Sequence, residues 1–191
     1  MKVTSAEFVK PIRNGDDLLT DNLPQIVFIG RSNVGKSSVI NSFARKQGLA
    51  RSSSTPGRTQ EINVFLINKA FYLIDLPGYG YARGSFANRE RLSEYISWYL
   101  FSPEIKHHKV VLIIDTKVGL TADDKHILKE LEESGKDIVI LANKADRLKS
   151  GELKTALMKL RQEIGEKHLL IPYSAKDFTG IGALVEAILP R

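Results

Sequence analysis

Short apolar runs alternate with amphipathic stretches along most of this chain. Runs of this length bounded by Gly, Pro and polar residues are typical of buried strands, whereas apolar positions spaced by three and four residues indicate helices. The pattern predicts strands near residues 25–29, 61–67, 70–75, 109–115, 137–142 and 168–173. It predicts helices near residues 36–46, 86–101, 121–134, 150–165 and 178–189.

This alternation predicts an α/β fold, with a doubly wound, mostly parallel sheet of six strands and helices on both faces. Only Asn68 and Lys69 separate two of the strands, so we expect a hairpin there and one antiparallel edge strand. We expect residues 23–191 to form a single domain and residues 1–22 to be an extended lead-in that packs on it.

A phosphate-binding motif, Gly-x-x-x-x-Gly-Lys-Ser, lies between the strand 25–29 and the helix 36–46. Its glycines let the backbone approach a phosphate chain, and its N–H groups and the helix N-terminus supply positive potential. We therefore predict a P-loop NTPase, with Lys36 on the β- and γ-phosphates and Ser37 on Mg²⁺. A turn without a ligand is the alternative, but the Lys-Ser pair in register argues against it. The expected contacts are Gly30, Arg31, Ser32, Asn33, Val34, Gly35, Lys36, Ser37 and Ser38.

A base-reading motif follows the strand 137–142, as Asn143-Lys144-Ala145-Asp146. The Asp146 carboxylate can accept hydrogen bonds from N1–H and the N2 amine of guanine, and adenine offers neither donor. We expect Asn143 to tie this loop to the phosphate loop and the Lys144 stem to cover one face of the base. Alone, the motif could be a polar turn in which Asp146 caps the next helix.

A weaker motif, Ser174-Ala175-Lys176, follows the strand 168–173. It suits a backbone N–H contact to guanine O6 and packing against the base. Because a match of three residues is common by chance, it only supports the base-reading motif.

Two segments have the features of nucleotide-sensing switches. The strand 70–75 runs into Asp75-Leu76-Pro77-Gly78, where Asp75 would orient a Mg²⁺-bound water and the Gly78 N–H would contact the γ-phosphate. Residues 51–60 are rich in Ser, Gly and Pro, as in a loop that a γ-phosphate and Mg²⁺ could order. Thr55 or Thr59 could complete the metal shell, and we favour Thr59 because it lies just before the strand 61–67. A solvated linker would fit the same composition if the other motifs were absent.

Tyr79 occupies the position where Ras-like GTPases have the Gln that orients the attacking water. Hydrolysis must therefore be slow or use a group from elsewhere. In several GTPases without this Gln, an Asn at the position of Asn33 helps to hold a K⁺ ion, so we expect K⁺ to stimulate hydrolysis. The alternative is that Asn33 only hydrogen-bonds its own loop.

Composition narrows the setting. The chain of 191 residues has no Cys, no apolar run that could span a bilayer and no signal-peptide core, so we expect a cytoplasmic protein. Its net charge is +6, and several basic residues lie around the two switch segments and on the helix 150–165. This charge is compatible with contacts to phosphates of structured RNA, although no RNA-binding module is recognisable. We expect a monomer without DNA or membrane partners.

Three segments together resemble one family: Gly-Arg-Ser-Asn-Val-Gly-Lys-Ser at 30–37, Thr-Pro-Gly-Arg-Thr-Gln at 55–60 and Asp-Leu-Pro-Gly-Tyr-Gly-Tyr-Ala at 75–82. This is the EngB family (also YihA or YsxC) of small bacterial GTPases, and the resemblance covers nearly the whole chain. One departure is Asn143, where members often have Thr. The resemblance implies Mg²⁺ bound by Ser37 and Thr59, a role in large ribosomal subunit assembly, and a link to cell division and septation.

The predicted site therefore binds GTP or GDP with Mg²⁺, held by Ser37, Thr59 and Asp75, and K⁺ is a further expected ion. The residues expected to act in hydrolysis are Lys36, Thr59, Gly78 and Asn33. Nucleotide contacts beyond the phosphate loop are Gly57, Arg58, Thr59, Gln60, Glu61, Asp75, Leu76, Pro77, Gly78, Asn143, Lys144, Ala145, Asp146, Ser174, Ala175 and Lys176.

Three functions remain open from the sequence. The favoured one is a ribosome-assembly GTPase that contacts rRNA and ribosomal proteins of the large subunit. The others are a GTPase switch that acts on a protein partner without RNA contact, and a nucleotide-binding scaffold with negligible turnover. An ATPase is disfavoured because Asn143-Lys-x-Asp146 argues against adenine.

Overall fold

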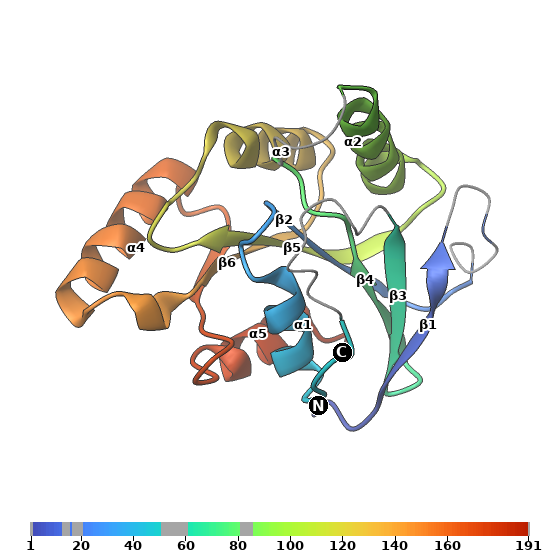
Figure 1. The fold of residues 1–191 in the computed structure, drawn as a ribbon, viewed down its shortest axis with the longest axis horizontal. Coiled ribbons are helices and arrows are strands. Elements are labelled where there is room, and N and C mark those ends of the chain that lie inside the picture. Colours follow the sequence, from blue (N-terminus) through green and yellow to red (C-terminus); the bar gives the residue numbers. More distant parts are fainter. Residues whose placement is uncertain (1, 13–15, 17–20, 51–60, 81–85, 191) are drawn as a thin grey trace.

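A seven-stranded sheet forms the centre of the molecule in the computed structural model, which describes residues 2–12, 16, 21–50, 61–80 and 86–190. The strand order is β1-β3-β4-β2-β5-β6-β7 (Figure 1). The strands are β1 (Ala6–Ile12), β2 (Gln25–Gly30), β3 (Ile62–Ile67), β4 (Phe71–Asp75), β5 (His107–Asp115), β6 (Ile138–Asn143) and β7 (Leu169–Pro172).

Five α-helices connect and cover the strands of the described chain. They are α1 (Lys36–Phe43), α2 (Phe86–Phe101), α3 (Ala122–Glu133), α4 (Ser150–Ile164) and α5 (Ile181–Ile188), with a short 3₁₀ helix, η2, at Ala145–Arg147. The predicted α/β class and the predicted elements are thus confirmed, with bounds that shift by a few residues.

The sheet is parallel from β4 through β2, β5 and β6 to β7. β3 is antiparallel to β4, as the hairpin at Asn68 and Lys69 predicts, and both of these turn residues have positive φ. β1 is antiparallel to β3 and forms the edge of the sheet. The prediction of six strands was therefore one short. β3 is the reversed strand that the hairpin predicts, and β1, which runs in the same direction as the parallel strands, lies outside it at the edge of the sheet.

The hydrophobic pattern does not predict β1, because only its two end residues, Ala6 and Ile12, are buried. The five residues between them are exposed and include Pro11, and proline is tolerated in sheets mainly on edge strands. The pairing with β3 also shifts register between Phe8 and Lys10. Its place in the sheet is set by backbone hydrogen bonds rather than by an apolar face.

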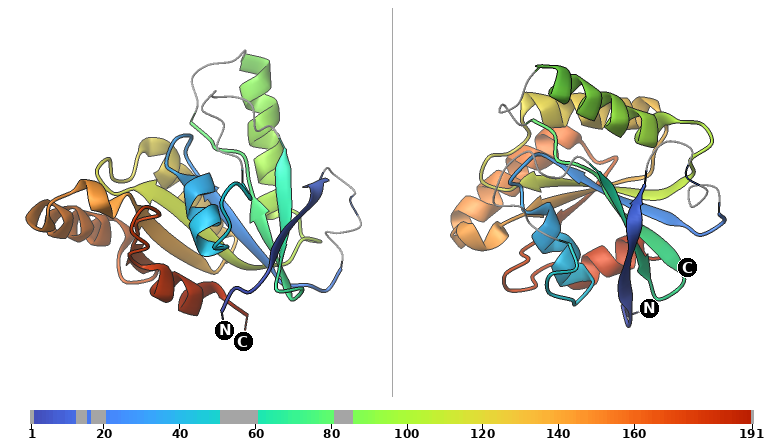
Figure 2. Two further views of the ribbon diagram at one scale, coloured as in Figure 1. Left: turned by 60° about the horizontal axis from the view of Figure 1, so that its bottom comes forward. Right: turned by 45° about the vertical axis from the view of Figure 1, so that its right-hand side comes forward.

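Helices cover both faces of the sheet, and each face has its own hydrophobic cluster. Side chains of α2, α3 and α4 join one cluster, and side chains of α1 and α5 join the other. The two views of Figure 2 show the same division into layers. In β2, Val27 and Ile29 face the first cluster, whereas Ile26 and Phe28 face the second. Burial on both faces explains why the central strands are continuous apolar runs.

Candidate functional site

The phosphate loop connects β2 to α1 at the carboxyl edge of the sheet (Figure 1). Gly35 has φ +96, and a Cβ on it would lie 2.5 Å from Asn143 Nδ2. A Cβ on Gly30 would lie 2.5 Å from the Ile113 carbonyl oxygen. Gly35 therefore makes room for the Asn143 side chain and Gly30 for the Ile113 backbone. No side chain caps the start of α1, so its first N–H groups face the loop and suit an anion.

Lys36 and Asp75 meet at this edge of the sheet. Lys36 begins α1, Asp75 ends β4, and Lys36 Nζ pairs with Asp75 Oδ1. Both side chains are largely buried. The structure thus brings the predicted phosphate cation and the predicted metal-associated carboxylate together, next to Ser37 on the first turn of α1.

The segment after β4 lies directly against the phosphate loop. The Leu76 N–H donates to the Phe28 carbonyl, and the Ser32 N–H donates to the Tyr79 carbonyl at 2.9 Å. A Cβ on Gly78 would come within 3.0 to 3.1 Å of Ser32 atoms. Because a side chain at position 78 would push this segment outward, glycine permits the contact.

The base-reading loop is attached to the phosphate loop as the sequence predicted. Asn143 is 2% exposed, and its Nδ2 donates to the Val34 carbonyl at 2.9 Å. Lys144 has φ +64, and its Nζ donates to the Asn33 carbonyl at 2.7 Å and to Asp115 Oδ2 at 2.8 Å. The stem of Lys144 therefore reaches from β6 across to the phosphate loop.

Asp146 and Ser174 come together although 28 residues separate them. Ser174 is fully buried, and its Oγ donates to Asp146 Oδ1 at 2.8 Å. The same Oγ accepts from the Lys176 N–H at 3.2 Å, while the Ala145 N–H donates to the Tyr173 carbonyl. One oxygen of the Asp146 carboxylate is thus oriented by Ser174, and the residue remains exposed at the mouth of the site.

Asp115 is a site residue that the sequence analysis missed. It ends β5 and forms the ion pair with Lys144, with main-chain N–H groups of Lys117 and Val118 beside it. Burial tends to raise the pKa of Asp115, but the hydrogen bond and charge of Lys144 and the two N–H groups outweigh it and lower that pKa below the usual value. A polar residue at the end of a predicted strand was the signal that could have identified it.

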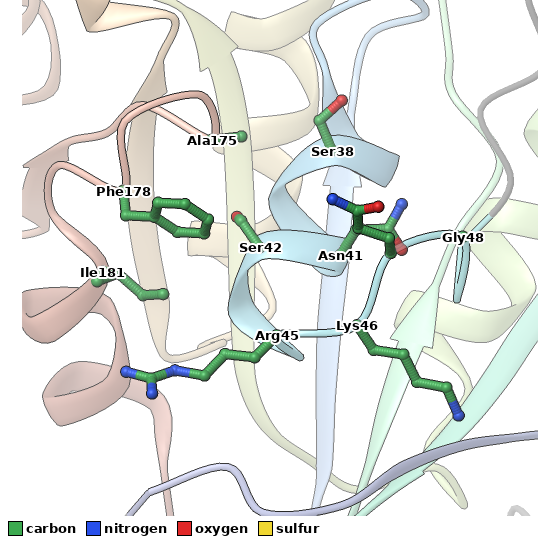
Figure 3. Close-up of a pocket in the computed structure, with 10 residues that line it drawn as sticks. Ser38, Asn41, Ser42, Arg45, Lys46, Gly48, Ala175, Phe178 and Ile181 are labelled. Carbon is green, nitrogen blue, oxygen red and sulfur yellow. The ribbon is translucent and has the colours of Figure 1, made fainter.

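A groove of about 680 Å³ extends the site along α1 (Figure 3). Ser38, Ser42 and Arg45 line it from α1 and the residues that follow, and Ala175, Phe178 and Ile181 line it from the opposite side. The Ser42 hydroxyl is within 2.6 Å of the Tyr173 hydroxyl, which joins α1 to the end of β7. Two predicted nucleotide contacts, Ser38 and Ala175, thus form part of the groove wall.

Four of the predicted contacts, Gly57, Arg58, Thr59 and Gln60, lie outside the described residues, as does Thr55. Glu61 is exposed immediately before β3. The completion of the metal shell by Thr59 therefore stays a prediction.

The described residues fit a guanine nucleotide with Mg²⁺. A glycine cradle, an uncapped helix start and a buried Lys suit phosphates, and the Ser174-oriented carboxylate of Asp146 suits the two donors of guanine. Ser37 supplies an oxygen ligand of the kind that Mg²⁺ prefers, and the Asp75 carboxylate could orient a water bound to that ion.

Comparison with known proteins identifies the family. The model of the "50S ribosome-binding GTPase" family matches residues 25–144. A Clostridium perfringens protein, "Probable GTP-binding protein EngB", is 39% identical over 189 residues, which cover 97% of this chain and 95% of the relative. The chain belongs to the EngB family of GTP-binding proteins. An EngB protein of Clostridioides difficile is 37% identical over 99% of this chain. As a member of the EngB family, the chain is a GTPase of the ribosome-biogenesis class.

Solved structures agree with the EngB assignment. The crystal structure of an EngB protein superposes with a TM-score of 0.71 at 26% identity, covering 86% of this chain and 96% of that one. Era, in complex with MgGDPNP and nucleotides of 16S ribosomal RNA, superposes with a TM-score of 0.70 at 20% identity. The match covers 88% of this chain and 57% of Era, and it shows a common fold. Among the residues that the structure describes, no helix is both long and apolar enough to cross a membrane.

Proposed function

We propose that this EngB-family protein is a Mg²⁺-dependent, GTP-controlled switch in the assembly of the large ribosomal subunit, and that it is needed for normal cell division and septation. The observation that carries the nucleotide part is the hydrogen bond from Asn143 to the Val34 carbonyl, which fixes the base-reading loop to the phosphate loop. The family description, a 50S ribosome-binding GTPase, supports the ribosomal part.

In the proposed complex, Lys36 and the N–H groups of residues 33–38 bind the phosphates, and Asp146 reads the guanine. Ser37 and Thr59 would hold Mg²⁺, and Asp75 would orient a water bound to it. Bound Mg²⁺ would neutralise charge on the β- and γ-phosphate oxygens. The Gly78 N–H would contact the γ-phosphate, a contact that GTP offers and GDP does not.

Hydrolysis is slow in this proposal because Tyr79 replaces the water-orienting Gln. Asn33, at φ +67 in the phosphate loop, is the candidate K⁺ ligand. Turnover should therefore be faster in K⁺ than in Na⁺ at equal ionic strength, and the gain should disappear in Asn33→Ala. Equal rates in the two salts would remove K⁺ from the mechanism.

In this proposal the protein is a cytoplasmic, monomeric GTPase that contacts rRNA and ribosomal proteins of the large subunit. It has no membrane or DNA partner. The net charge of +6 is compatible with phosphate contacts. The competing function is a GTPase switch that acts on a protein partner, for example in division, without contacting RNA.

Co-sedimentation with large ribosomal subunits, in GDP or in a non-hydrolysable GTP analogue, tests the proposal. We expect binding with the analogue and little with GDP. Lys36→Ala is the control, because it removes the phosphate cation and should abolish both nucleotide binding and co-sedimentation. Absence of binding in either nucleotide would leave the GTPase intact and favour the protein partner.

A further inference from the structure

Tyr79, next to the proposed γ-phosphate contact, is held at both its main chain and its side chain. Its carbonyl accepts the Ser32 N–H at 2.9 Å, and the residue forms a parallel β-bridge with Arg31. Its hydroxyl donates to Asp124 Oδ1 at 2.6 Å. Tyr79 thus links the phosphate loop to the first turn of α3.

Asp124 is a rigid acceptor for this hydroxyl. It is 2% exposed, and its Oδ2 accepts from the Thr121 N–H at 2.8 Å and from Thr121 Oγ1 at 2.6 Å. The bond from the Thr121 N–H is one half of the capping box of α3, and the bond from the Asp124 N–H to Thr121 Oγ1 is the other. One carboxylate oxygen thus secures the start of the helix, and the other holds Tyr79. A buried carboxylate is stable only when it is well hydrogen-bonded, and bonds to charged acceptors are among the stronger ones.

Residues 78–80 run through a narrow space between the phosphate loop and α3. A Cβ on Gly78 would approach Ser32 to 3.0 Å. Gly80 has φ +72, and a Cβ on it would lie 2.8 Å from both Arg31 Cγ and Asp123 Oδ2. The phosphate loop and α3 thus lie close to residues 78–80 on either side, and the Tyr79 hydroxyl bonds this segment to α3.

The hydroxyl of Tyr79 is committed to Asp124, so in this arrangement it is not directed at a water beside the phosphates. Burial and the Asp124 charge raise the pKa of Tyr79 well above its usual value, which keeps the hydroxyl a donor. We propose that Tyr79 is a positioning residue: its bond to Asp124 holds Gly78 against the phosphate loop, ready for the γ-phosphate, and couples the second switch to the start of α3.

This inference rests on the proposed contact between Gly78 and the γ-phosphate. When Gly78 is held in place beforehand, GTP does not have to order residues 78–80 as it binds. GDP has no γ-phosphate, so the prior ordering of residues 78–80 does not increase its affinity. Loss of the Tyr79 hydroxyl should therefore weaken GTP binding selectively.

Tyr79→Phe removes only the hydroxyl and is the central variant. We expect its Kd for GMPPNP to rise about tenfold, as for the loss of one hydrogen bond to a charged group, while its Kd for GDP changes less than about twofold. Tyr72→Phe is the matched control, because the Tyr72 hydroxyl donates to Asp21 Oδ2 at the same 2.6 Å, away from the site. Its ratio of the two Kd values should equal that of the wild type.

Asp124→Asn keeps an acceptor for Thr121 but makes the partner of Tyr79 neutral, so it should reduce the preference for GMPPNP by less than Tyr79→Phe. Thermal unfolding of each variant shows whether it is folded at the temperature of the titration. If Tyr79→Phe and Asp124→Asn both keep the wild-type ratio, the inference is overturned.

Gly78→Ala separates this inference from the function on which it rests. If Gly78→Ala loses the preference for GMPPNP but Tyr79→Phe keeps it, the γ-phosphate contact stands and the positioning role of Tyr79 fails. If Gly78→Ala also keeps the preference, the γ-phosphate contact is wrong, and the role of Tyr79 is overturned with it.

Discussion

At the scale of residues, the Asp146 side chain in this EngB-family site is oriented by a second side chain, that of Ser174. Ser174 occupies one oxygen of the carboxylate, and the exposed remainder is available to a base. The orientation thus comes from a residue on a different loop. Asn143 and Lys144 act similarly on the phosphate loop through its carbonyl groups.

Asp146→Asn should weaken GDP binding by about a hundredfold, because an amide cannot replace a carboxylate as acceptor of two donors. The same variant should gain affinity for xanthosine diphosphate, whose C2 oxygen can accept from the new amide. Calorimetric titration with both nucleotides measures the change. Asp137→Asn is the control, because Asp137 lies before the opposite end of β6 and pairs with Lys109. An Asp146→Asn protein with unchanged preference would contradict the base-reading role.

Gly35→Ala should be more damaging than alanine at a comparable glycine. Gly35 combines φ +96 with a contact of 2.5 Å from its Cβ to Asn143 Nδ2, whereas Gly135 has φ +64 and nothing within 4 Å. We expect Gly135→Ala to lower the free energy of unfolding by about 1 kcal/mol, from backbone strain alone. Gly35→Ala should cost about 1 to 2 kcal/mol more and abolish nucleotide binding. Denaturant unfolding compares the two, and similar costs would argue against a tight contact at Gly35.

At the scale of elements, the residue Asp124 that helps to cap α3 also contacts the candidate site through Tyr79. Its N-cap Thr121 and its N3 residue Asp124 bond each other reciprocally, and Asp124 also receives the Tyr79 hydroxyl. The start of this helix is therefore fixed by two separate parts of the chain.

Thr121→Ala should lower the free energy of unfolding by about 1 kcal/mol, the usual cost of a lost N-cap. Thr155→Ala is the control, since the Thr155 hydroxyl only returns to the Gly151 carbonyl within α4 and alanine is the better helix former. Its effect should be near zero or slightly stabilising. Chemical denaturation of both variants provides the measurement, and an equal loss in the two would show that the cap is unimportant.

The sequence predicted the elements with strong patterns and missed those fixed by long-range contacts. The buried runs of β2 and β6 and the glycine-bounded phosphate loop were predictable from local chemistry. β1 was missed because its exposed middle has no apolar alternation, and its pairing partner lies some 55 residues later in the chain.

Two helix ends were misplaced for similar reasons. The predicted helix 36–46 ends at Phe43, since Arg45 takes positive φ and the Lys46 N–H folds back to the Asn41 carbonyl. The predicted helix 178–189 begins only at Ile181, because residues 174–180 form a closed turn through the bond from the Ser174 N–H to the Thr179 carbonyl. Within the site, Asp115 and the Tyr79–Asp124 bond depend on contacts between distant segments and leave no local pattern.

At the scale of the whole molecule, one histidine makes the stability depend on pH. His107 lies at the start of β5, with Tyr99 packed edge-on against its ring and Lys136 Nζ 3.1 Å from Nδ1. Burial, and then the charge of Lys136, lower the pKa of His107 from 6.5 to about 4. The unfolded chain therefore takes up a proton on this residue before the folded chain does.

The contribution of His107 is fully present above about pH 6.5 and is lost as the pH falls towards 4. The free energy of unfolding should fall by about 3 kcal/mol from this group over that range. His107→Gln should remove this part of the pH dependence, whereas His108→Gln, at an exposed neighbour, should retain it. Denaturant midpoints at pH 7, 6, 5 and 4 test this, and parallel curves for wild type and His107→Gln would refute it.

The separation of phosphate loop and base-reading residues along the chain has a consequence during synthesis. The phosphate loop is synthesised before Asn143 and Asp146, which come much later in the chain, and Ser174 follows them. A nascent or truncated chain can therefore have the phosphate cradle without any means of telling guanine from adenine. Selectivity for guanine would then arise only after Asn143, Asp146 and Ser174 have been added to the chain.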